Sequence, residues 1–312
     1  MRVSSSSFAD SFSYQTNQLE SQQNTLQSEA TTGLKFSLPE DDPAGMTQAL
    51  ELQSDSSANT QYQNNITQLQ DSATTSYNAL NGLQTLISQA NTIAAGVDGT
   101  TSTQELSSYA TEIGGIIQQA LQLANTQDSQ GNYIFGGTNA STPPFAATTD
   151  ANGNVTGVTY QGNTSVAQAE IAPGVTISAQ TLGANTTGSG PRGLITDSRS
   201  GADLFNHLIT LQNDLASGNV SAVSTTDAQQ LSKDQDNIDY QVGSNGVVQS
   251  TLTNTNSVAT QQGTNLTTQM SNLTSANLAT TLTQLQQTQT SYQAALQSGV
   301  QVMQLSLLDY LY

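Results

Sequence analysis

Hydrophobic residues at both ends of the chain recur in alternating steps of four and three, the spacing of a helix that packs along a single seam. The N-terminal seam consists of Phe8, Phe12, Gln15, Leu19, Gln22 and Leu26. The C-terminal seam consists of Leu278, Leu282, Leu285, Gln289, Tyr292, Leu296, Gly299 and Met303. Because a lone helix leaves such a seam exposed, we expect the two ends to pair and neighbouring copies to cover what remains.

Two further helices are predicted inside the N-terminal half. Asp42 suits the N-cap position and Pro43 the first helical position, where its missing N–H costs nothing. The same four-and-three spacing then runs through residues 62–97 and resumes at residues 106–123, with Gly99 in the short interval between them. We therefore expect two antiparallel helices joined by a short loop.

The residue pattern changes at Gly131, where glycines, prolines and short runs of Val, Thr and Ile replace the helical spacing of hydrophobic residues. Residues 155–160 follow an Asn-Gly-Asn turn and predict a strand. Leucines at helical spacing resume at Leu204, and a final long helix is expected from about Gln261 almost to Tyr312. The strand-rich insert is expected to be the part of the chain that is free to project sideways.

These patterns predict a mainly α protein, an elongated antiparallel helical bundle or coiled coil made from both chain ends, with a central β-rich insert domain. The expected segments are an N-terminal assembly helix (1–40), the first half of the bundle (41–130), the insert (131–194), the second half of the bundle (195–260) and a C-terminal assembly helix (261–312).

Composition and charge exclude several kinds of partner. The formal net charge is -18, which opposes binding to nucleic acid or to anionic lipid. No apolar run approaches the roughly 20 residues that span a bilayer, so we expect no membrane insertion. The Ser-rich start lacks the apolar core of a signal peptide, and export without a cleaved signal is expected.

The candidate catalytic and metal motifs all have simpler interpretations. Residues 188–193 spell G-x-G-x-x-G without a βαβ unit around them, which favours a flexible hinge. Asp150, Asn152 and Asn154 resemble a calcium loop but fit a hairpin turn better. His207 is the only histidine and there is no cysteine, so we expect a solvated or cap-like histidine, no catalytic residue, no metal and no cofactor.

The apolar content of the N-terminal seam is small. Burying one of its apolar side chains contributes about 1.5 to 3 kcal/mol. Ordering each residue of the helix costs about 1 to 2 kcal/mol, and only four seam residues are apolar. We therefore predict that the terminal helices are disordered in a free subunit and become helical on assembly.

Three separated motifs resemble the flagellin superfamily. The first is Leu26, Gln27 and Ser28 followed by Gly33 and residues 41–45; the second is Leu305 to Leu311 after Tyr292 to Leu296; the third is Gly131 to Thr138 with Pro143 to Phe145, at the expected entry to the insert. The C-terminal motif is most similar to the family members that join hook to filament. The chain departs from the family at residues 29–32, where a Ser/Thr-Gly-Lys/Arg stretch is usual.

The resemblance implies a structural adaptor of the bacterial flagellum, located outside the cell and exported unfolded by the flagellar type III apparatus. It implies self-association in a ring or tube, contacts with hook-associated protein 1 and flagellin, and an export chaperone on the C-terminal helix. Filament flagellin itself, or a surface adhesin that uses the β-insert, are the alternatives.

The residues expected to carry assembly are the apolar members of the terminal helices. They are Phe8, Phe12, Leu19, Leu26, Leu282, Leu285, Tyr292, Leu296, Met303, Leu307 and Leu308.

Overall fold

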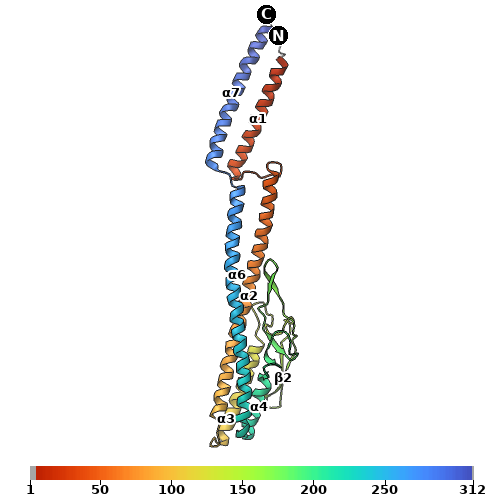
Figure 1. Ribbon diagram of the computed structural model, residues 1–312, viewed down its shortest axis with the longest axis vertical. Helices are drawn as coiled ribbons and strands as arrows, with labels where there is room; N and C mark the ends of the chain where they lie inside the picture. The colour runs from red at the N-terminus through yellow and green to blue at the C-terminus, as the bar shows by residue number, and fades with distance from the viewer. Residues whose placement is uncertain (1–4, 311–312) are drawn as a thin grey trace. The chain divides into compact units, whose positions relative to one another are not determined.

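The computed structural model describes the backbone of residues 5–310 and the side chains of residues 9–302. Its helices are α1 (Ser5–Thr32), α2 (Pro43–Gly96), α3 (Thr103–Ala124), α4 (Leu204–Ser217), α5 (Val220–Ala222), the π-helical turn η1 (Val223–Asp227), α6 (Ala228–Thr274) and α7 (Leu278–Tyr310) (Figure 1). The prediction of a mainly α fold with central strands is confirmed.

The chain forms two compact units whose limits fall inside α2 and α6. Unit 1 comprises residues 1–58 and 262–312, and unit 2 comprises residues 59–261. Unit 1 thus contains α1, α7 and the adjoining ends of α2 and α6, while unit 2 contains the other helices and all the strands.

The starts of α2 and α3 follow from their capping residues. Pro43 is the first residue of α2, and the Asp42 Oδ1 atom accepts a hydrogen bond from the backbone N–H of Gly45 at 2.9 Å. Ser102 and Glu105 form a capping box at the start of α3, with the Ser102 backbone N–H donating to Glu105 Oε2 at 2.9 Å.

The strands form three small sheets. β1 (Phe145–Thr149) and β2 (Val155–Tyr160) form an antiparallel hairpin, as do β3 (Ala169–Ala172) and β4 (Val175–Ile177). β5 (Leu182–Asn185) runs parallel to β6 (Gly193–Asp197), which pairs antiparallel with β7 (Ala202–Asp203). The predicted strand at 155–160 is confirmed, and Asp150 accepts backbone hydrogen bonds from Asn152 and Asn154 in the hairpin turn.

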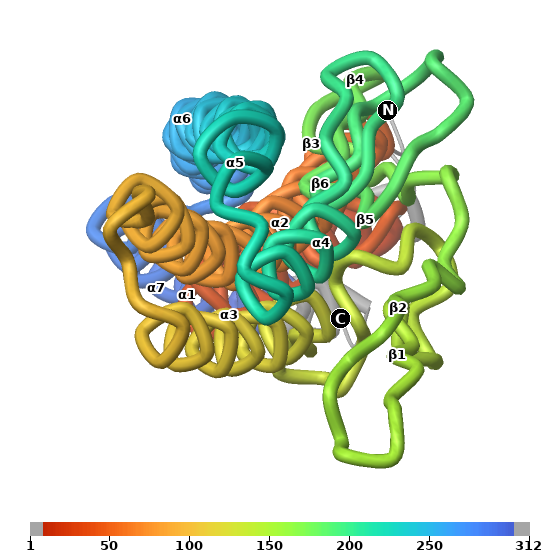
Figure 2. Tube along the Cα trace, turned by 90° about the horizontal axis from the view of Figure 1, so that it is seen from below, coloured from red at the N-terminus to blue at the C-terminus, as the bar shows by residue number. Residues whose placement is uncertain are grey.

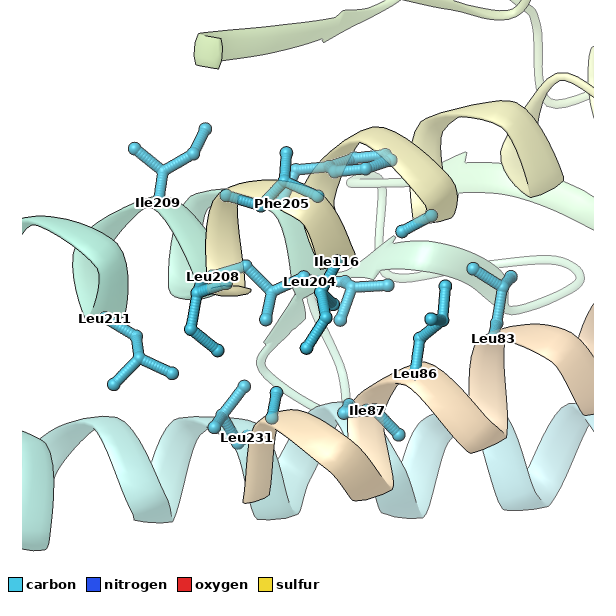
Figure 3. Close-up of a cluster of buried hydrophobic side chains, with 14 of the residues drawn as sticks. Leu83, Leu86, Ile87, Ile116, Leu204, Phe205, Leu208, Ile209, Leu211 and Leu231 are labelled. Atoms are coloured by element: carbon cyan, nitrogen blue, oxygen red, sulfur yellow. The ribbon is translucent and has the colours of Figure 1, made fainter. Parts of the chain in front are cut away.

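The strands and helices of unit 2 pack together in two hydrophobic clusters. Phe145, Leu194 and Ile195 of the strands belong to the same buried cluster as the helical leucines. In Figure 2 the strands lie to one side of the helices, and Figure 3 shows side chains from α2, α3, α4 and α6 converging. The expectation of an insert free to project is therefore wrong, because its apolar residues complete the helical core.

Buried amide side chains connect α6 to the rest of unit 2. Asn59 of α2 donates to the carbonyl of Ala259, and Asn245 of α6 donates to the carbonyl of Ala73. Asn237 of α6 donates to the carbonyls of Gly193 and Leu194 at 2.9 and 2.8 Å. Such bonds fix the helix register in a sequence with few charges, because buried polar atoms that lose their partners are costly.

We expect Asn237→Ala to lower the free energy of unfolding of unit 2 by about 2 to 4 kcal/mol, because two buried carbonyls lose their donors. Asn254→Ala, at an exposed position of the same helix, is the matched control, with a change within about 0.5 kcal/mol. Urea denaturation of both variants measures the difference. Equal losses in the two variants would contradict a special role for Asn237.

The prediction of one continuous final helix from Gln261 is wrong. α6 ends at Thr274, and α7 begins at Leu278. Ser275 leaves the helix to form an antiparallel bridge with Leu34, and the Asn277 Oδ1 atom accepts from the Thr280 N–H at 3.3 Å. The new N-cap restarts the helix.

Candidate assembly surface

The two terminal helices pair antiparallel in unit 1, as the seams predict. α1 and α7 lie side by side, with the start of α1 next to the end of α7 (Figure 1). Two contacts define the register: Phe12 lies against Gly299, and the Thr281 hydroxyl donates to Glu29 Oε2 at 3.3 Å. In this register Leu19 and Leu26 lie near the levels of Tyr292 and Leu285.

The positions that face inward in this pair differ in part from the predicted seam. On α1 the buried or half-buried row consists of Phe12, Thr16, Leu19, Gln23 and Leu26. On α7 it consists of Thr281, Leu285, Thr288, Tyr292, Ala295 and Gly299. Gln15, Gln22 and Gln289 are exposed, so their assignment to the seam is wrong.

Small residues on α7 give the seam its shape. Thr281 and Thr288 are 4% and 6% exposed and occupy inward positions next to the larger residues of the predicted seam, Leu282 and Gln289. A Cβ atom on Gly299 would clash with the Phe12 ring. The ring therefore fills the notch that the glycine leaves, and the two helices can approach closely there.

Four apolar residues that α1 does not cover form an exposed row on α7. Leu278, Leu282, Leu296 and Val300 are 47%, 51%, 41% and 54% exposed. With about 100° of rotation per residue, these four positions lie roughly a quarter turn from the inward row. We call these four residues the outer row. Of the predicted assembly residues, Leu282 and Leu296 are in the outer row, and Leu285 and Tyr292 are in the inward one.

Four of the predicted assembly residues have side chains that lie outside the described residues: Phe8, Met303, Leu307 and Leu308.

Within unit 1, two short segments connect α1 to α2 and α6 to α7, and they run next to each other. Gly33, at φ 71°, ends α1, and its carbonyl accepts from the Ala276 N–H at 2.8 Å. The Lys35 N–H donates to the Thr274 carbonyl at 2.7 Å, and Lys35 Nζ donates to the Asn272 carbonyl at 2.9 Å. Backbone hydrogen bonds thus link the two segments on both sides of the Leu34–Ser275 bridge, and we call this place the crossing.

Charged residues are distributed unevenly along the chain, a feature that the spacing of hydrophobic residues does not show. No Asp, Glu, Lys or Arg occurs between Tyr240 and Leu308, although the chain as a whole carries a net charge of -18. Most of α6 and nearly all of α7 are therefore neutral and rich in Thr, Gln and Ser. This stretch is therefore the longest part of the sequence without a formal charge before Asp309.

The motifs considered for catalysis have structural roles. The loop at 188–193 is held by Asn185 Nδ2, which donates to the carbonyls of Ser189 and Pro191, so the prediction of a flexible hinge is wrong. His207 is also not solvated, because its Nδ1 atom lies 2.7 Å from Asp234 Oδ2.

Within the described part of the chain, no group of three or more His, Cys, Asp or Glu side chains could hold a metal ion. No helix among the described residues has the length and hydropathy needed to cross a bilayer.

Asp197 holds the return from the strands to α4. It is fully buried and accepts from the Arg199 side chain at 2.7 Å and from the Gly193 N–H at 2.9 Å. Burial alone would raise the pKa of Asp197, but the hydrogen bonds from Arg199 and Gly193 outweigh burial and lower the pKa. The ion pair closes a turn and leaves no side chain poised for chemistry.

The comparison with protein families supports the resemblance to flagellins in the N-terminal part of the chain. Residues 3–140 match the family model of the bacterial flagellin N-terminal helical region. Over 117 residues the chain is 35% identical to flagellar hook-associated protein 3 of Escherichia coli, an alignment covering 37% of either protein. Over 139 residues it is 33% identical to flagellar hook-associated protein 3 of Salmonella typhimurium, covering 44% of each. These alignments span less than half the length of the two relatives.

Solved structures extend the likeness to most of the fold. A putative flagellar hook-associated protein from Vibrio parahaemolyticus superposes with a TM-score of 0.64 at 20% identity, covering 75% of this chain and all of that one. FlgL of Bacillus cereus superposes with a TM-score of 0.54 at 20% identity, covering 71% and 99%. The resemblance to the flagellin superfamily, stated from three motifs, is confirmed.

Proposed function

We propose that this flagellin-like chain is a structural adaptor of the bacterial flagellum that joins hook to filament. The observation that carries the proposal is the outer row of α7. These four apolar residues are exposed because α1 covers α7 on one side only. The two curated relatives are named flagellar hook-associated protein 3. An apolar row of this kind requires a covering surface, and in an assembling protein that surface belongs to a neighbour.

Neighbouring copies are the first partner that we propose. Copies with a net charge of -18 repel each other, and the repulsion is weakest where the surface is neutral. α7 carries its outer row within the charge-free stretch, so apolar burial there meets little electrostatic opposition. Assembly through α7 into a ring or tube follows from this combination.

Other partners are proposed on the family likeness alone. Hook-associated protein 1 and flagellin would flank the ring, and an export chaperone would cover the C-terminal helix before assembly. Export outside the cell without a cleaved signal belongs to the same proposal. The ordering of α1 and α7 on assembly stays a prediction, to be tested by circular dichroism of a dilute free subunit.

Removal of residues 305–312 tests the adaptor function in cells. We expect the truncated chain to leave hooks without attached filaments, because the end of the C-terminal assembly helix is missing. Electron microscopy counts the fraction of hooks that carry filaments, in a strain whose own copy is deleted. Filaments attached at the normal frequency would count against the adaptor function.

The location of the chain separates the adaptor from filament flagellin. Immunogold labelling is expected to mark one band between hook and filament, whereas a filament flagellin would be labelled along the whole length. An adhesin would depend instead on the exposed strands. Deleting residues 139–187 is a poor test of adhesion because Phe145 and Leu182 belong to the core of unit 2. Val175→Ser, at a position that is 51% exposed, changes the insert surface without opening the core.

A further inference from the structure

A buried acidic residue, Asp227, lies in unit 2 where η1 packs against α4, next to the half-buried Asp214. Asp227 in η1 is 1% exposed, and neither of its carboxylate oxygens has a hydrogen-bond donor among the residues that the structure describes. The carboxylate of Asp214 on α4 is close enough to act on Asp227 electrostatically and to raise its pKa. Asp214 also accepts from Asn219 Nδ2 at 3.0 Å. A carboxylate that is buried without a hydrogen-bond donor is destabilised when it is ionised, so the position of Asp227 favours its protonated form.

Several apolar residues close to Asp214 and Asp227 in the sequence are fully buried. Leu211 and Leu215 of α4 and Val223 of η1 are at most 1% exposed. In Figure 3, Leu208 and Leu211 of α4 and Leu231 of α6 lie around the same part of the core. An ionised carboxylate at Asp227 therefore loses its solvation without gaining a hydrogen-bond donor among the described residues.

The electrostatics of Asp227 agree with this geometry. Burial raises the pKa of Asp227 to about 6, and the neighbouring Asp214 carboxylate adds to the rise, whereas His207 opposes the shift. These are the groups that face Asp227 from α4.

A second titrating pair lies close by, between α4 and α6. His207 of α4 and Asp234 of α6 are 2.7 Å apart, with Asp203 and Lys233 also facing the histidine. Burial alone would lower the pKa of His207, but the hydrogen bond and charge of Asp234 raise it overall. Burial raises the pKa of Asp234, and His207 opposes that shift. Asp227 and His207 thus both bind a proton more tightly in the folded protein than in the unfolded chain.

We propose that Asp227, beside Asp214, is a buried proton-binding site that holds η1 against α4 in acid and lets η1 separate from α4 as the pH rises. The proposal is independent of the adaptor function. A raised pKa in the folded state means that the bound proton stabilises the fold fully below about pH 4, and that this stabilisation is lost as the pH rises through about 6. The contribution of His207 is present below about pH 6.5 and is lost above it, which is the same direction.

The consequence is a local junction whose strength depends on pH. Near neutral pH the π-helical turn carries a buried negative charge opposite Asp214, and opening of the turn relieves it. In acid the proton bound by Asp227 removes that charge, and the turn stays closed. A protein with 23 acidic residues and 5 basic ones would gain a folded state that tolerates acid.

The test uses the full chain with Asp227→Asn, which keeps the shape of the side chain and removes its charge. For the unchanged chain we expect the unfolding equilibrium constant of unit 2 to rise by about tenfold or more between about pH 5 and pH 7.5. Asp227→Asn is expected to remove most of that rise, with the larger stabilisation at the higher pH. Asp214→Asn is the second variant, in case Asp227→Asn does not fold.

Asp236→Asn is the matched control because Asp236 is exposed on α6, close to both pairs in sequence. Hydrogen exchange is read over residues 214–230, where protection is expected to fall with rising pH in the unchanged chain and in this control, but not in Asp227→Asn. An unchanged pH dependence in both Asp227→Asn and Asp214→Asn would overturn the proposal. So would stabilisation by millimolar calcium at about pH 7.5 that is lost in Asp227→Asn, since the site would then bind a metal ion.

Discussion

Gly299→Leu is expected to have the largest effect of any single substitution in the described part of α7. The new side chain would occupy the space of the Phe12 ring, which then has to leave the seam. Overpacking of this kind costs about 1 to 3 kcal/mol, and expelling the ring removes part of the apolar burial of a thin interface. We expect α1 and α7 to separate and the fraction of hooks with filaments, counted by electron microscopy, to fall at least tenfold.

Two further variants make this result specific. Gly246→Leu, in open space on α6, replaces a helical glycine without meeting a neighbour, so assembly is expected to continue. Phe12→Ala combined with Gly299→Leu returns space to the seam, and the double variant is expected to recover part of the lost attachment. If Gly299→Leu assembles as well as Gly246→Leu, the notch between Phe12 and Gly299 has no importance for assembly.

Charged side chains in the outer row are expected to block assembly without weakening the free chain. Leu282→Glu and Leu296→Glu replace side chains that are 51% and 41% exposed, so the fold of the subunit loses little. Once a neighbour covers them, each unpaired carboxylate costs several kcal/mol, and 1.4 kcal/mol is already tenfold in an equilibrium constant. Joined together, the two substitutions are expected to abolish incorporation into the flagellum.

Thr290→Glu is the control for added charge. Thr290 is exposed on the side of α7 that faces away from the inward row, so a carboxylate there keeps its water. Secretion of all variants into the medium is measured at the same time, since a failure of export would also remove filaments. Normal attachment by the Leu282→Glu, Leu296→Glu double variant would show that the outer row stays uncovered in the flagellum.

Much of the helical fold could be predicted from residue spacing because amphipathic stripes and caps are local signals. Asp42 and Pro43 lie at the start of α2, and the turn at Asp150 precedes a strand with the predicted limits. The break at Ser275 could not be predicted in this way. Its cause is the bridge to Leu34, a partner that is far away in sequence.

The seam shows where spacing becomes ambiguous. Steps of four and three fit both the row with Leu282 and Leu296 and the row with Thr281 and Thr288. Hydropathy favours the leucines, whereas close packing against α1 selects small side chains. The buried state of Asp227 is also invisible in the sequence, because an acidic residue among polar neighbours gives no sign of burial.

The paired crossing at Gly33 and Ala276 has a mechanical consequence within unit 1. A single covalent linker would let the α1–α7 pair swivel freely about its own axis. Here two strands cross together, and swivelling would wind one strand around the other and pull apart the Lys35–Thr274 and Ala276–Gly33 bonds. Torque applied at one side of the crossing is therefore transmitted to the other, while a small tilt, which stretches neither strand, remains cheap.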